Sequence, residues 1–122
     1  MTLYYLATVY SKYPPGIEAA FEDAARLAGR LLKAGHVIYS PIVHSHPIAM
    51  FSGIDPLDHS FWLDFDARMM SVCDAILVAQ MTGWRESYGV NYEIEFARSY
   101  RKPVLYLNCR TLEMSAEQEK EK

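Results

Sequence analysis

The sequence has 122 residues, of which 51% are hydrophobic and 22% are charged, and its formal net charge is −3. These values are typical of one folded domain over residues 1–122, and the slightly acidic charge argues against a nucleic-acid polymer as a partner. No apolar run reaches the roughly 20 residues needed to cross a bilayer, and the N-terminus lacks the features of a signal peptide. We therefore expect a cytoplasmic protein without a membrane partner, in which the two cysteines are reduced.

Strands and helices alternate along the predicted chain. Apolar stretches rich in β-forming residues indicate strands, and apolar residues at helical spacing indicate helices. We expect strands over residues 3–9, 36–40, 74–81 and 102–108, and helices over residues 17–33, within 58–73, and over 88–101. Residues 41–56, in which Pro, Gly and Ser are spread, are predicted to be a loop, and residues 111–122 a short polar helix or a frayed end.

This alternation predicts an α/β fold. The expected architecture is a doubly wound, mainly parallel sheet of four or five strands with helices on both faces, as in Rossmann-like and flavodoxin-like proteins. Such sheets bind ligands beyond the carboxyl ends of their strands, where the strand order reverses. Residues 8–16, 40–47 and 82–89 follow the first three strands and are rich in polar and aromatic side chains. We expect a site where these three segments meet.

Two glutamates lie close together in the last predicted helix, within "WRESYGVNYEIEFARSY". A helix turns by about 100° per residue, so Glu93 and Glu95 point to different sides. In a helical projection Glu93 falls within the apolar arc, whereas Glu95 falls on the polar side. Glu93 is therefore predicted to point inward. A salt bridge or a hydrogen-bonded glutamate in the core would explain such a carboxylate, but its place near the positive helix end at the ligand side of the sheet favours a function.

Three stretches of the sequence resemble the nucleoside 2-deoxyribosyltransferase superfamily and its nucleotide N-hydrolase branch. These are "YLATVYS", "DFDARMMSVCDAILV" and "GWRESYGVNYEIEFARSYRKPVLYL", and the resemblance covers most of residues 3–107. It implies cleavage or transfer at the N-glycosidic bond of a nucleoside or nucleotide through a glutamyl-glycosyl intermediate, with no cofactor. It also implies a homo-oligomer, since neighbouring subunits commonly help to close the site.

The resemblance assigns roles to individual residues. Glu93 would be the nucleophile, Tyr5 would orient it, and Asp66 would protonate or hydrogen-bond the leaving base. Asp64 is the rival to Asp66, because it lies two positions away on the same predicted helix. Ser87 stands where the transferases carry an aspartate and the nucleotide hydrolases a serine. The basic residue with which those hydrolases meet a phosphate is missing after the first strand.

Further residues are candidates for substrate contact. The resemblance implies that Ser87 contacts the sugar or phosphate, Ser11 stands near the place of the missing phosphate-binding residue, and Gly89 is a further candidate. Trp84 could stack on a base or pack in the core or at an interface. His46, with His44 beside it, could contact a ligand, form ordinary loop hydrogen bonds or bind a metal. Two histidines without a third patterned ligand are a weak metal signal, so no metal is expected.

Two other functions compete with the enzymatic interpretation. The first is a nucleotide-binding module of the same fold that does not turn its ligand over. The second is a metal-dependent hydrolase built around His44 and His46. The base, the sugar, the acceptor and the need for a 5′-phosphate are left open by the sequence.

Overall fold

The structure is a computed structural model that describes residues 1–116. Its described residues form one five-stranded sheet with the strand order β2-β1-β3-β4-β5, in which β5 pairs antiparallel and the other pairs are parallel. The strands are β1 (Leu3–Ala7), β2 (Val37–Tyr39), β3 (Ala75–Ala79), β4 (Val104–Leu107) and β5 (Met114–Ala116). The helices are α1 (Ile17–Lys33), α2 (Pro41–Ser52), α3 (His59–Val72), α4 (Tyr88–Ser99) and the short 3₁₀ helix η1 (Trp84–Glu86). The doubly wound α/β fold predicted from the sequence is confirmed.

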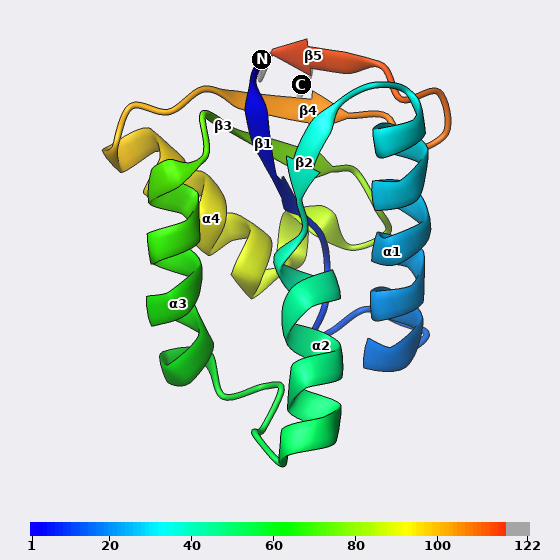
Figure 1. Cartoon of the computed structure of the whole chain (residues 1–122), viewed down its shortest axis with the longest axis vertical. Coiled ribbons are helices and arrows are strands. Elements are labelled where there is room, and N and C mark those ends of the chain that lie inside the picture. Colours follow the sequence, from blue (N-terminus) through cyan, green and yellow to red (C-terminus); the bar gives the residue numbers. More distant parts are fainter. Residues whose placement is uncertain (117–122) are drawn as a thin grey trace.

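The sheet separates two apolar cores because side chains alternate across each strand. Tyr5 of β1 packs on one face with β3, α3 and α4, whereas its neighbour Leu6 packs on the other face against α1. Figure 1 shows the same division, with α1 on one side of the strands and α3 and α4 on the other. Because both faces are covered, β3 is apolar throughout and every one of its residues is buried.

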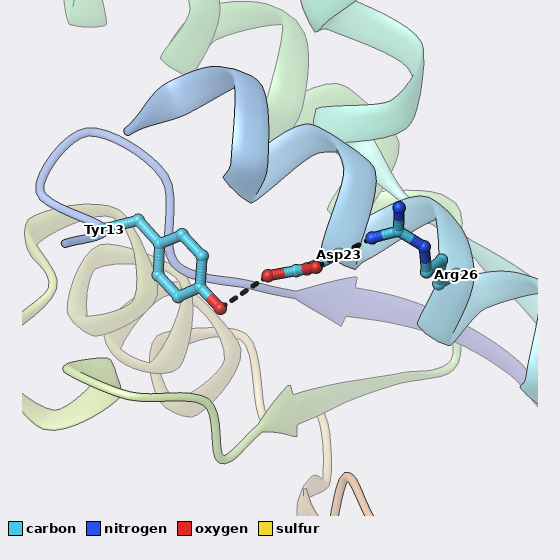
Figure 2. A network of polar contacts seen from close by, with 3 residues as sticks. All are labelled: Tyr13, Asp23 and Arg26. Atoms are coloured by element: carbon cyan, nitrogen blue, oxygen red, sulfur yellow. Dashed lines mark hydrogen bonds and ion pairs between the residues drawn. The ribbon is translucent and has the colours of Figure 1, made fainter. Parts of the chain in front are cut away.

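A polar network attaches the loop after β1 to helix α1. The Tyr13 hydroxyl donates a hydrogen bond of 2.8 Å to Asp23 of α1, and Arg26 donates one of 3.0 Å to the other carboxylate oxygen of Asp23 (Figure 2). Burial, followed by the hydrogen bond to Asp23, raises the pKa of Tyr13 to about 12. The loop that carries Tyr10 and Ser11 toward the site is thereby held against a regular helix.

The prediction of a loop over residues 41–56 is wrong, because most of this segment is helix α2. Ser40 caps the helix by accepting a hydrogen bond of 3.3 Å from the Val43 amide, and Pro41 occupies the first turn, where its missing N–H costs little. Gly53 ends the helix in the left-handed conformation, with φ of 79°. Pro47 lies inside the helix. The residues interpreted as loop formers are therefore mostly the start and stop signals of a helix.

The prediction of a helix or a frayed end after residue 110 is also wrong within the described part of the chain. The side chain of Asn108 accepts hydrogen bonds from the amides of Arg110 and Thr111, at 2.9 and 3.0 Å, and so closes a turn. Leu112 has a φ of 68° within this turn. The chain then returns as β5 and covers the edge of β4. Residues 117–122 lie outside the described residues.

The strand order reverses between β1 and β3, whose connections leave to opposite sides of the sheet. In an open α/β sheet this point forms a crevice beyond the carboxyl ends of the strands. The segments after β1, β2 and β3 and the start of α4 converge there (Figure 1). Within residues 1–116, none of the helices is both long and apolar enough to span a membrane.

Candidate functional site

A pocket lies at the crevice where the strand order reverses. Its volume is about 580 Å³ when the open space at its mouth is included. The wall is formed by the segment after β1, by α2, by the approach to α3 and α3 itself, and by the start of α4. The lining residues are Thr8, Tyr10, Ser11, Ile42, Ser45, Pro56, His59, Trp62, Leu63, Asp66, Ser87, Gly89 and Glu93.

Helix α4 brings Glu93 to the pocket and keeps Glu95 away from it. The helix begins after Ser87, whose hydroxyl caps it by accepting a hydrogen bond of 3.2 Å from the Val90 amide. Glu93 then lies in the second turn on the buried face and is 8% exposed. The side chain of Glu95 is 74% exposed and lies 3.9 Å from Arg98. The predicted division of the two glutamates between an inner and an outer face is confirmed.

A buried hydrogen bond joins Tyr5 to Glu93. The Tyr5 hydroxyl donates to Oε2 of Glu93 over 2.9 Å, and the two residues come from β1 and α4. Tyr5 is fully buried and lies behind the carboxylate rather than in the pocket wall. The predicted orientation of Tyr5 toward Glu93 is confirmed. The bond holds one carboxylate oxygen in place and leaves Oε1 free of this bond.

The electrostatics of the site oppose negative charge on its carboxyl groups. Burial raises the pKa of Glu93 well above its usual value, the charge of Asp66 raises it further, and the hydrogen bond from Tyr5 lowers it. Burial raises the pKa of Asp66 to about 6. The positive end of helix α4 favours an ionised Glu93, whereas burial acts in the opposite direction. Burial therefore favours the protonated form of each of the two carboxyl groups.

Helix α3 brings Asp66, and not Asp64, to the pocket. Asp66 lines the pocket beside Glu93, whereas Asp64 is exposed and faces a separate surface depression with Phe61 and Arg68. The two aspartates point apart because they are two residues apart on a helix. The choice of Asp66 over Asp64 as the residue of the site agrees with this geometry.

Two polar atoms in the pocket wall lack partners. Among the described residues, the buried Oγ1 of Thr8 and the buried Oδ1 of Asp66 have no hydrogen-bond partner. The buried hydroxyl of Tyr39, outside the pocket wall, also has none. An unpaired buried polar group costs about 1–3 kcal/mol. Groups of this kind in a pocket wall are suited to a ligand or a water that pairs with them.

Three of the predicted binding residues lie in the pocket wall. Ser87 and Gly89 line it from the start of α4, and Ser11 lines it from the segment after β1. The Ser87 hydroxyl is also the cap of α4, so its lone pairs are partly committed to the helix. A Cβ added at Gly89 would meet no atom within 4 Å, so the glycine leaves open space in the wall.

Trp84 does not lie in the pocket, and another tryptophan does. Trp84 packs against Tyr106 with ring centroids 5.4 Å apart, and the Arg85 guanidinium lies 4.7 Å from the centre of its ring. The expected contact of Trp84 with a base is therefore not found in the structure. Trp62 of α3 lines the pocket instead, and its ring nitrogen donates a hydrogen bond of 3.0 Å to the Asp55 carbonyl.

His46 lies behind the pocket wall, so the predicted direct contact with substrate is not found. It is 2% exposed because it belongs to the inner face of α2, which the sequence interpretation did not recognise as a helix. His44 faces elsewhere and stacks on Phe65 with ring centroids 5.2 Å apart. In the described part of the chain, no three His, Cys, Asp or Glu side chains are grouped so that they could hold a metal ion.

Several lining residues were not selected from the sequence. Helix α3 contributes His59, Trp62 and Leu63. The helical spacing of His59, Trp62 and Asp66 places these three side chains on one face of α3. That spacing was a usable signal once Asp66 had been chosen. The other residues missed come from loops or from α2, and they are Thr8, Tyr10, Ile42, Ser45 and Pro56.

Comparison with known proteins places the chain in a family without giving it an activity. The sequence model of the family described as "Domain of unknown function (DUF1937)" matches residues 2–108. The match covers all elements that form the pocket. A search of curated proteins finds no match.

Proposed function

The chain belongs to the DUF1937 family, and we propose that it cleaves the N-glycosidic bond of a nucleoside through a glycosyl-enzyme intermediate on Glu93. The observation that carries this proposal is the buried hydrogen bond between Tyr5 and Glu93 at the wall of a pocket that also contains Asp66. Retaining glycosidases use two neighbouring carboxyl groups, of which one is the nucleophile and the other the acid and base. The resemblance of the motifs around Tyr5, Asp66 and Glu93 to deoxyribosyltransferases supports the same assignment.

The proposed first step uses one carboxyl as nucleophile and the other as acid. Oε1 of Glu93 attacks C1′ of the sugar while the bond from C1′ to the base nitrogen breaks, and the proton of Asp66 passes to the departing nitrogen. The pKa of about 6 for Asp66 supports this role, because a carboxyl with that pKa still holds a proton in part of its molecules near neutral pH.

The proposed second step releases the sugar. A water molecule gives a proton to the Asp66 carboxylate and attacks C1′, which breaks the ester to Glu93 and restores both carboxyl groups. A second base could attack C1′ in the same way, and the reaction would then be a transfer. The Tyr5 hydrogen bond contributes by stabilising the anionic form of Glu93, which both attacks and leaves.

The charge of the pocket favours an uncharged nucleoside over a nucleotide. Its wall contains Asp66 and Glu93, and among the described residues that line it there is no Lys or Arg. Lys12, the cation nearest in sequence to the segment after β1, is exposed and does not line the pocket. A 5′-phosphate placed here would face acidic groups without a Lys or Arg to pair with.

Released base is the direct test of this function. Common nucleosides, their 2′-deoxy forms and the matching 5′-phosphates should be incubated with the protein, with and without a second base as acceptor. We expect base release from one or more nucleosides and little or none from the 5′-phosphates. A nucleoside with fluorine at C2′ slows both steps, so it should leave a sugar on Glu93 that mass spectrometry of the intact protein and its peptides can locate.

A specific observation favours a second candidate, a nucleoside-binding module without turnover. Burial raises the pKa of Glu93, and a protonated Glu93 would be a hydrogen-bonding contact rather than a nucleophile. Binding of a nucleoside without base release, and without an adduct from the fluorinated compound, would select this candidate.

We also propose that the chain associates with itself. Large apolar side chains are exposed on neighbouring parts of α2 and α3, including Phe51 at 92% and Phe61 at 50%. Exposed apolar groups of this kind are common at protein interfaces. Light scattering coupled to gel filtration gives the mass in solution, and a monomer at all concentrations tested would contradict the proposal.

A further inference from the structure

A chain of three side chains leads from the pocket to the surface through a buried histidine. The Tyr10 hydroxyl lies 2.6 Å from Nδ1 of His46, and Nε2 of His46 lies 3.0 Å from Oε1 of Glu18. Tyr10 lines the pocket, His46 is 2% exposed, and the Glu18 side chain is 67% exposed. The three residues come from the segment after β1, from α2 and from α1.

The histidine ring is fixed on more than one side. Phe21 of α1 stacks on it with ring centroids 4.6 Å apart and an angle of 20° between the planes. The Tyr10 ring meets it edge-on at 5.8 Å. Since both ring nitrogens have partners and Phe21 stacks on the ring, His46 has little freedom to turn. It is therefore able to fix the direction of the hydrogen bonds on either side.

The chemistry of Glu18 decides where the protons of this chain lie. A carboxylate only accepts hydrogen bonds, so Nε2 of His46 must donate to Glu18. Nδ1 of the neutral ring then has a lone pair and no proton, and it accepts the hydrogen bond from Tyr10. The Tyr10 proton is thereby directed away from the pocket. Burial and the charge of Glu18 raise the pKa of Tyr10 to about 12, so the phenol keeps that proton.

We propose that Tyr10 accepts a hydrogen bond from a hydroxyl of the bound sugar, and that His46 and Glu18 are positioning residues that hold the Tyr10 proton away from the ligand. The lone pairs of the Tyr10 oxygen are the part of this group left for a partner in the pocket. They select a ligand group that can donate, such as a sugar hydroxyl, and disfavour one that only accepts, such as a phosphate oxygen. The identity of the ligand as a sugar rests on the proposed function, whereas the direction of the hydrogen bonds does not.

Nitrogen-15 NMR of the histidine rings tests the direction without any ligand. We expect the neutral His46 ring with its proton on Nε2 and an unprotonated Nδ1. Glu18→Gln should change the tautomer populations of His46, because a carboxamide can donate as well as accept. Glu22→Gln is the matched control, since Glu22 is an exposed residue one turn further along α1 and carries the same charge. A proton on Nδ1 of His46 in the unaltered protein would overturn the proposal.

Binding measurements test the contact with the sugar. Calorimetry on the Glu93→Gln background, which prevents turnover, should first identify which of 2′-deoxyadenosine, 2′-deoxyguanosine, 2′-deoxycytidine and thymidine binds most tightly. Its analogues that lack the 3′ or the 5′ hydroxyl are then compared with it. We expect Tyr10→Phe to weaken binding about tenfold, on the scale of one hydrogen bond. In the protein with Tyr10, one of the two analogues should bind about tenfold more weakly than the parent nucleoside. In the Tyr10→Phe protein, that analogue and the parent nucleoside should bind equally well.

The outcomes separate this proposal from the proposed function. If removal of each hydroxyl weakens binding by the same factor in the Tyr10→Phe protein as in the protein with Tyr10, neither hydroxyl contacts Tyr10. The proposed contact then does not exist, even where base release is observed. If the hydroxyl and Tyr10 are coupled but the unaltered protein releases no base, the contact stands and the glycosidic activity fails. If none of the four nucleosides binds, the contact with the sugar fails, and base release by the unaltered protein still decides the proposed function.

Discussion

Tyr5 and Glu93 are 88 positions apart in the sequence, yet the hydroxyl of the first donates a buried hydrogen bond of 2.9 Å to the carboxylate of the second. The bond connects the interior strand β1 to the helix α4 that follows β3. Its burial means that neither group can exchange its partner for water without local rearrangement. The first two predictions concern this pair.

Glu93→Gln and Glu93→Ala should abolish base release while the protein remains folded, since a carboxamide or methyl group cannot form the glycosyl ester. Glu95→Gln should leave the rate nearly unchanged, because Glu95 is on the solvent side of α4. Rates from single-turnover assays and circular dichroism of each variant provide the check. Equal losses of activity in folded Glu93 and Glu95 variants would remove Glu93 from the mechanism.

Tyr5→Phe should reduce the rate of glycosyl transfer to Glu93 by about 10- to 1000-fold and leave the Kd for nucleoside nearly unchanged. Without this hydrogen bond the pKa of Glu93 should rise further, so the acidic limb of the pH–rate profile should move to higher pH. Tyr4→Phe is the control, because Tyr4 lies on the opposite face of β1 and packs with the α1 core. An unchanged profile in Tyr5→Phe would show that the bond only stabilises the fold.

Asp66→Asn should slow the release of poor leaving bases more than that of activated ones, since a proton donor matters most for a poorly departing nitrogen. The same change removes a negative charge near Glu93, so the pKa of Glu93 should fall and the acidic limb should move to lower pH. Asp64→Asn should show neither effect, because Asp64 is exposed outside the pocket. If Asp64→Asn, and not Asp66→Asn, slows poor leaving bases more than activated ones, Asp64 is the acid.

The stability of the free protein should fall between about pH 4 and pH 6 as Asp66 ionises. The folded protein binds this proton more tightly than the unfolded chain, whose aspartates titrate near pH 3.9. The resulting stabilisation is complete below that value and is lost as the pH rises through about 6. The shift corresponds to at most about 3 kcal/mol. Urea unfolding at several pH values should show a smaller fall for Asp66→Asn, and an equal fall in both proteins would contradict the assignment.

The sequence by itself determined the features that depend on periodicity. The alternation of strands and helices follows from local hydrophobic spacing, and so does the separation of Glu93 from Glu95, because one helix face must meet the sheet. The opposite directions of Tyr4 and Tyr5 follow from the geometry of a single strand.

Only the tertiary structure decided which side chains meet in the pocket. The sequence pointed to Trp84 as a partner for a base, but α3 carries Trp62 into the wall while Trp84 packs on Tyr106. The helix at Pro41–Ser52 turned His46 inward, so that it binds Tyr10 instead of facing the ligand. These outcomes depend on where separate elements pack against one another. Local spacing determines which face of an element is buried, but contacts between distant elements determine what that face meets.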